Sequence, residues 1–266
     1  MSTVAFTLLD SATMFRRDVR HALRFPALTI SGVFLPVLFL LLFDGVFGHT
    51  LQAGLATAAT NAGPYIDYLT AGILLMTAAS AAEATALTVC TDMNEGVITR
   101  LRTMSVSRTA VLSGVVLGSV VRTVITGGVV LAVAFALGFR STATPIEWIG
   151  VVGIFALIAV SLTWLTVSFG LLAKTPSGAN SLALILIVLP FVSNAFIPTD
   201  SMPAGVRWFA ANQPFTPMID TLRGLLNGTA VGHTAVIAVA WSIALSLVGY
   251  LVARSRYDRL PPASGK

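Results

Sequence analysis

The fold class of this chain is decided by the run EWIGVVGIFALIAVSLTWLTVSFGLL, residues 147–172. Its only charged residue is the first, Glu147, and about 20 apolar residues in a helix are enough to cross the hydrocarbon core of a bilayer. The composition of the whole chain agrees, since 56% of its 266 residues are hydrophobic and 10% are charged, against roughly 25% charged in soluble domains. A water-soluble fold could not cover so much apolar surface, so the sequence predicts an integral membrane protein.

Working outward from this run, five further runs have the length and composition of membrane spans. We therefore predict an all-α polytopic membrane protein, built as a single transmembrane domain over residues 1–266. The six spanning helices are expected at about 27–48, 65–90, 110–138, 147–172, 178–197 and 231–253.

The basic residues predict the orientation, because cytoplasmic segments are enriched in lysine and arginine. With the N-terminus inside, the inner segments hold 12 of the 16 basic residues, namely Arg16, Arg17, Arg20, Arg24, Arg100, Arg102, Arg108, Lys174, Arg254, Arg256, Arg259 and Lys266. The outer segments hold Arg140, Arg207 and Arg223. This imbalance predicts a multi-pass protein of the plasma (inner) membrane with both termini cytoplasmic. It also explains the net charge of +5 without a nucleic-acid partner.

The inner segment TDMNEGVITRLRTMSVSR, residues 91–108, has a pattern of its own. Asp92 and Glu95 precede Gly96, and the bases Arg100, Arg102 and Arg108 follow. Acids at the start and bases at the end suit the dipole of a helix, and apolar residues recur between them at helical spacing. The segment is expected to be a short amphipathic helix that offers a charged surface to a soluble partner. An ordinary basic loop is the alternative interpretation.

The outer segment at 198–230 is expected to hold two short helices. Four prolines divide it, because proline interrupts a helix: Pro198, Pro203, Pro214 and Pro217. Amphipathic turns lie between the prolines, so we expect re-entrant or interfacial helices before the last span, with Trp208 near the level of the lipid headgroups.

Glu83 and Arg122 lie within predicted spans, where an ionisable group is costly and is a functional candidate by default. We hypothesise that the two form an intramembrane ion pair. The alternative is two independent groups, each near an interface or hydrogen-bonded locally.

Three stretches together resemble the ABC-2 type transporter permeases, especially those of the daunorubicin-resistance kind. In the inner segment, Asp92, Gly96, Arg100, Arg102 and Arg108 match the cytoplasmic signature, whereas Ser105 stands where that family usually has proline. In the outer segment the matching residues are Pro198, Met202, Pro203, Trp208, Asn212, Pro214, Thr216 and Arg223. The opening RFPALTISGVFLPVLFLLLFDGVFG is also similar, so the resemblance covers nearly the whole chain.

The resemblance implies a mechanism. Two six-helix permeases, identical or paralogous, pair in the lipid, and two ATPase subunits dock beneath them. Residues 91–108 would be the coupling helix, and the stretch from Met14 would be an amphipathic interfacial helix held at the headgroups by Arg16, Arg17, Arg20 and Arg24. The expected function is ATP-driven export of a hydrophobic or amphipathic compound: a drug, an antibiotic or a lipid. Export of a polysaccharide or glycolipid is the near alternative, although the aromatic residues are dominated by phenylalanine.

The sequence contains no G-x-x-x-x-G-K-[ST] motif, whose backbone would cradle nucleotide phosphates. We therefore expect no cofactor and no catalytic residue in this chain, with ATP and magnesium bound by the partner subunit. One cysteine and three dispersed histidines favour neither a metal site nor a membrane enzyme. A proton-coupled transporter that uses Glu83 would call for inverted repeats, and none is evident.

Overall fold

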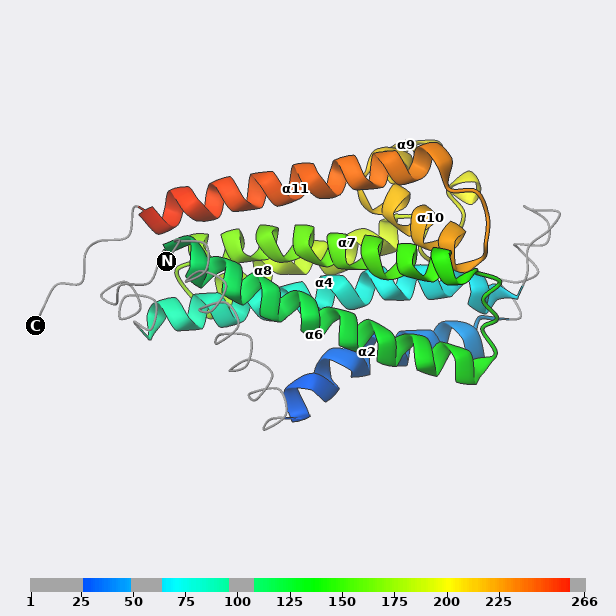
Figure 1. Ribbon diagram of the computed structural model, residues 1–266, viewed down its shortest axis with the longest axis horizontal. Helices are drawn as coiled ribbons and strands as arrows, with labels where there is room; N and C mark the ends of the chain where they lie inside the picture. The colour runs from blue at the N-terminus through cyan, green and yellow to red at the C-terminus, as the bar shows by residue number, and fades with distance from the viewer. Residues whose placement is uncertain (1–25, 49–63, 96–107, 259–266) are drawn as a thin grey trace, which may run out of the picture.

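The computed structural model describes residues 26–48, 64–95 and 108–258 (Figure 1). Every regular element in these ranges is a helix, which confirms the predicted all-α class. The α-helices are α2 (Pro26–Gly45), α4 (Tyr65–Asn94), α6 (Arg108–Leu137), α7 (Pro145–Leu172), α8 (Pro176–Val188), α9 (Ala204–Asn212), α10 (Phe215–Leu226) and α11 (Gly232–Asp258). Two 3-10 helices complete the set, η1 (Leu189–Val192) and η2 (Thr199–Ser201).

Four helices of the described chain, α4, α6, α7 and α11, are long and apolar enough to cross a membrane. They correspond to the second, third, fourth and sixth predicted spans. The first and fifth predicted spans correspond to shorter apolar helices, Gly32–Gly45 and Pro176–Val192.

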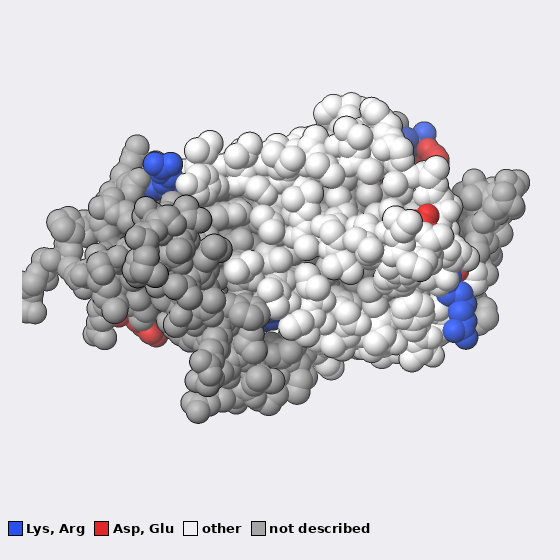
Figure 2. Space-filling model, viewed as in Figure 1, with Lys and Arg blue, Asp and Glu red and all other residues white. Residues whose placement is uncertain are grey.

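The helices form an elongated bundle in which α4 is central (Figure 1). It packs against α2, α6, α7, α8 and α10, while α11 packs chiefly against α7. Leu69, Ile73 and Leu75 of α4 are completely buried. On the face seen in Figure 2 the charged side chains of the described residues gather toward the two ends of the bundle, and the middle is almost free of them. This banding is what a protein dissolved in a bilayer requires.

The starts of α7 and α8 are fixed by local sequence. Thr144 and Glu147 form a reciprocal capping box: the Glu147 N–H donates to Thr144 Oγ1, and the Thr144 N–H donates to Glu147 Oε2 at 2.6 Å. Thr175 Oγ1 likewise accepts from the Gly178 N–H at 3.2 Å. In each case proline follows the capping threonine, where its missing N–H costs nothing.

The end of α8 corrects the predicted fifth span, which was expected to run to residue 197. The α-helix ends at Val188 and continues only as the short η1. Pro190 explains the change, because it lacks an N–H and its ring crowds the carbonyl four residues earlier. The chain then turns at Ser193, whose hydroxyl donates to Pro190 O at 2.6 Å. The turn brings Ala195 so close to α4 that a Cβ on Gly72 would lie 2.7 Å from Ala195 O.

Two further glycines allow helices to pack at backbone contact. A Cβ on Gly249 of α11 would lie 2.5 Å from the carbonyl carbon of Trp164 in α7. A Cβ on Gly170 of α7 would lie 2.7 Å from Ala86 O in α4. Small residues permit this close approach between helices in lipid, so α4, α7 and α11 form the tightly packed part of the bundle.

The segment before the last long helix contains the two predicted short helices, α9 and α10. Helix α10 is amphipathic, with Met218, Ile219 and Leu222 fully buried. At its C-terminal end, α4 extends beyond the predicted end at residue 90 and stops at Asn94. Residues 96–107, the centre of the predicted coupling helix, and the N-terminal stretch before Pro26 lie outside the described residues.

Candidate functional site

Arg223 of α10 is the centre of a polar network at the end of the bundle that holds the short helices. Its guanidinium donates to three oxygens: Nε to Tyr68 O at 3.2 Å, Nη2 to Asn194 O at 2.8 Å and Nη1 to Asp220 Oδ1 at 2.9 Å. It also lies over the Tyr68 ring, 3.7 Å from the centroid, a favourable cation–π geometry. One side chain thus joins α4, the turn after η1 and α10.

The partners of Arg223 are bonded to one another. Tyr68 Oη donates to Asn194 O at 2.7 Å, and Asn194 Nδ2 donates to Asp220 Oδ1 at 2.5 Å. Burial raises the pKa of the Asp220 carboxyl, while Arg223 and Asn194 act in the opposite direction. Asn194 Oδ1 is buried without a hydrogen-bond partner in the described structure. We call Tyr68, Asn194, Asp220 and Arg223 the Arg223 network.

The residues that the sequence singled out in the outer segment do not form one site in the structure. Pro198 precedes η2, Pro203 precedes α9 and Pro214 precedes α10, so each begins a new element. Pro217 does not break the chain as expected, because it lies in the first turn of α10, where the missing N–H of proline costs no hydrogen bond. Trp208 of α9 is 71% exposed, whereas Arg223 is inside the network. Sequence reasoning identified Arg223 but missed Tyr68, Asn194 and Asp220. Only Asp220 carried a signal, since a carboxylate three residues before an arginine shares its helix face.

A second polar cluster lies in the middle of the bundle between α4, α6 and α7. Thr85 Oγ1 and Ser119 Oγ are 2.7 Å apart, and Ser119 Oγ is 3.5 Å from Thr163 Oγ1. All three side chains are at most 2% exposed. Arg122 Nη2 donates to Thr85 Oγ1 at 3.3 Å. Hydroxyls that bond between helices hold them together where water is absent.

The structure does not bring Glu83 and Arg122 together, which corrects the hypothesised pair. Among the described residues no ion pair joins them. The reason is helical geometry: residues two apart project about 200° apart. Because Thr85 faces Arg122, Glu83 points to the other side of α4, where it is half-buried. The alternative of two independent groups is therefore the one that this structure supports.

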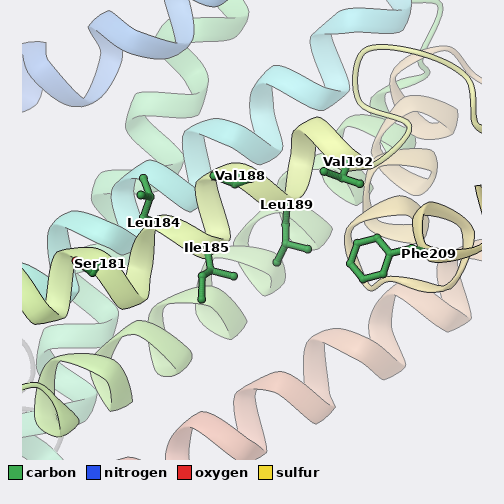
Figure 3. A pocket seen from close by; sticks show the side chains of 7 residues that line it. All are labelled: Ser181, Leu184, Ile185, Val188, Leu189, Val192 and Phe209. Atoms are coloured by element: carbon green, nitrogen blue, oxygen red, sulfur yellow. The ribbon is translucent and has the colours of Figure 1, made fainter. Parts of the chain in front are cut away.

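An apolar groove of about 360 Å³ runs along the side of the bundle (Figure 3). It is lined by Ser181, Leu184, Ile185, Val188, Leu189, Val192 and Phe209. The first six follow α8 and η1, and Phe209 closes one end from α9. The lining is almost entirely apolar, so the groove suits hydrocarbon. No group of three or more possible metal ligands was found in residues 26–48, 64–95 and 108–258.

A sequence profile described as "ABC-2 type transporter" matches residues 11–227, which is most of the chain. The chain belongs to this ABC-2 family. Among curated proteins it is 26% identical over 207 residues to "Daunorubicin resistance ABC transporter permease protein DrrB1" of Streptomyces coeruleorubidus, with 77% of this chain and 71% of the relative covered.

Two further ABC-2 relatives cover more of the chain. "Putative transport permease ycf38" of Porphyra purpurea is 28% identical over 224 residues, 82% of this chain and 74% of the relative. "Probable doxorubicin resistance ABC transporter permease protein DrrC" of Mycobacterium tuberculosis is 24% identical over 245 residues, 92% of this chain and 85% of the relative.

The ABC-2 signature residues of the inner segment are only partly within the described structure. Asp92 lies in the last turn of α4, and Glu95 caps that helix with its N–H bonded to Thr91 O at 2.9 Å. Arg108 begins α6. Gly96, Arg100 and Arg102 lie outside the described residues, as do Arg16, Arg17, Arg20 and Arg24, so their roles stay predictions.

Proposed function

We propose that this chain is the membrane-spanning permease subunit of an ABC exporter that moves a hydrophobic or amphipathic compound, powered by ATPase subunits on separate polypeptides. The observation that carries the proposal is the ABC-2 profile match over residues 11–227, combined with a sequence that has no phosphate-cradling motif. Names of two relatives specify daunorubicin or doxorubicin resistance, which supports an apolar or amphipathic cargo. ATP and magnesium would bind in the partner.

The proposal includes six spans, and the helix lengths support it. Helix α2 has 20 residues, which corresponds to about 30 Å at the usual rise per residue, the thickness of the hydrocarbon core. Helix α8 and η1 together cover 17 residues, about 27 Å in all. Both can cross or nearly cross the bilayer beside the four longer helices, with α9 and α10 at the outer interface.

The proposed orientation places both termini in the cytoplasm. Lys174, between α7 and α8, and Arg254 and Arg256, near the end of α11, are on the inner side in this arrangement. Arg140, which follows α6, is on the outer side with α9 and α10. This orientation agrees with the usual enrichment of lysine and arginine in cytoplasmic segments. The inner segment between α4 and α6 then faces the ATPase, and a second permease, identical or paralogous, completes the pathway in the lipid.

Inverted membrane vesicles from cells that contain the permease test this function. ATP added outside should drive a hydrophobic fluorescent dye into the lumen, and vanadate should stop the uptake. Purification of the permease in mild detergent should recover an ATPase with a Walker A motif together with it. Uptake that persists without nucleotide and disappears with a protonophore would instead identify a proton-coupled transporter.

A further inference from the structure

One face of α4 changes from covered to uncovered at the middle of the helix. Residues spaced three or four apart lie along this face, and the first three of them, Leu69, Ile73 and Thr77, are completely buried. Farther toward the inner end, Ser80 is half-buried, Ala84 is exposed and Leu87 is 40% exposed. The covering therefore stops near Ser80, and the inner half of the face is open.

The position of α2 explains the opening. Its last turns pack beside the start of α4, and Leu40 is completely buried there. Toward its own start, α2 diverges from α4 (Figure 1), and its side chains Phe34 and Leu38 are 62% and 43% exposed. Pro36 interrupts the hydrogen bonding of α2 in the same region. The open face of α4 thus borders the region where the first half of α2 diverges from α4 (Figure 1).

Glu83 lies at the edge of this open face, one turn from Ser80. Within the described residues Glu83 has no hydrogen bond or ion pair, and Ser80 Oγ is buried without a partner. Both sit close to the midpoint of α4, where an unpaired carboxylate is costly in hydrocarbon. Within the described part of the chain, the open face therefore has a carboxyl group and a hydroxyl without a protein partner.

Among the described residues, no basic side chain is paired with Glu83. Among all 16 basic residues only Arg122 lies within a predicted span. Arg122 is on α6 and donates to Thr85, on the opposite side of α4 from Glu83. The other basic residues of the described chain lie at or near the ends of the helices or in the links between them, namely Arg108, Arg140, Lys174, Arg207, Arg223, Arg254 and Arg256. The described part of the chain thus leaves the Glu83 carboxyl open to a cation that a ligand brings.

We propose that Glu83 is the specificity-determining residue for amine-bearing cationic amphiphiles, which reach it through the open inner half of α4. This inference deepens the proposed function and rests on it. The ammonium group would pair with the Glu83 carboxylate and bond to the Ser80 hydroxyl. The apolar body would lie against Leu87 and the exposed side chains of α2. The apolar groove on α8 has no charged residue and could not make this selection.

Binding to the purified permease in lipid nanodiscs tests the inference without any ATPase. The probes are a fluorescent amphiphile with a primary amine and the same molecule with that amine acetylated. Glu83→Gln should weaken binding of the amine at least about tenfold and leave the acetylated probe unchanged. Glu83→Asp, which keeps the charge, should retain most of the selectivity. Asp200→Asn, which removes an exposed carboxylate outside the long helices, is the control and should bind both probes as the wild type does.

Three outcomes would overturn the inference: no preference for the amine in the wild type, an unchanged preference in Glu83→Gln, or an equal loss of both probes. Size-exclusion profiles confirm that each variant is folded. The vesicle assay separates this inference from the proposed function. ATP-driven uptake of the acetylated dye would support the exporter function even if Glu83 showed no preference for the amine probe. Amine selectivity in nanodiscs without ATP-driven uptake of either dye would contradict the exporter alone.

Discussion

The guanidinium of Arg223 lies 3.7 Å from the centre of the Tyr68 ring, although 155 residues separate the two in sequence. It also donates to the backbone oxygen of the same tyrosine. Arg223 therefore fixes α10 to the beginning of α4, and this contact is the basis of the first prediction.

Arg223→Lys should destabilise the protein by about 2–4 kcal/mol, because lysine cannot reach three acceptors and stack on the ring at once. Thermal unfolding in detergent measures the loss. Arg207→Lys is the matched control. Arg207 is exposed, and its guanidinium donates to the backbone oxygens of Asp200 and Met202. The loss of stability caused by Arg207→Lys should therefore stay below about 1 kcal/mol. Equal effects of the two substitutions would contradict a special role for Arg223.

The pKa of Asp220 predicts a pH dependence. Burial raises this pKa in the folded protein, so the neutral carboxyl stabilises the fold below about pH 4, the unfolded value. That contribution is lost as the pH rises through the raised folded pKa. The melting temperature of the wild type minus that of Asp220→Asn should therefore fall as the pH is raised from 4 to neutral. A difference that grows with pH would show that Arg223, rather than burial, dominates.

Gly249→Ala should destabilise the packing of α11 on α7. The added Cβ would lie 2.5 Å from the Trp164 backbone, and such overpacking costs about 1–3 kcal/mol. Gly153→Ala is the control, because a Cβ there meets nothing within 4 Å. It should be neutral or stabilise α7 by about 0.5–1 kcal/mol. Unfolding of both variants in detergent checks the opposite signs, and a loss of stability in both would point to a general intolerance of alanine.

Thr85→Val should cost about 1 kcal/mol, since the hydroxyl that meets Ser119 and Arg122 is lost. Thr77→Val provides the comparison. Thr77 is equally buried, but its hydroxyl bonds only to Ile73 O of its own helix. The prediction is wrong if denaturant unfolding shows the same small change in both variants.

Arg102→Glu tests the predicted coupling segment. Recovery of the ATPase in pull-down should fall several-fold, because reversal of a charge at an interface places like charges together. The melting temperature of the isolated permease should not change. Arg140→Glu, which follows the C-terminal end of α6, should leave recovery intact. Normal recovery and transport with Arg102→Glu would remove the docking role.

Local sequence predicted the parts of the fold that depend on local chemistry. Long apolar runs indicated α4, α6, α7 and α11, and the prolines at 203 and 214 marked the starts of α9 and α10. Pro190 was present in the fifth run, but its effect on a predicted span was overlooked. That omission produced the incorrect end of the helix at residue 197.

The contacts of individual polar groups could not be predicted in the same way. The Glu83–Arg122 hypothesis rested on the opposite charges of the two residues and on their positions within predicted spans. In the structure, α4 presents Thr85 rather than Glu83 to Arg122. Likewise, the turn that Pro190 imposes places Asn194 against Tyr68. Such contacts depend on how separate helices meet, which one amphipathic pattern does not contain.

Helix α4 is unbroken over 30 residues, about 45 Å, so its two ends belong to one continuous helix. At one end is Glu95, beside the segment expected to meet the motor, and at the other is Tyr68, clamped to α10 through Arg223. In the proposed orientation, a tilt of α4 that begins at Glu95 would also move the Arg223 network at its other end. Under the proposed function, the inner and outer ends of the transport path would then be linked by one continuous helix.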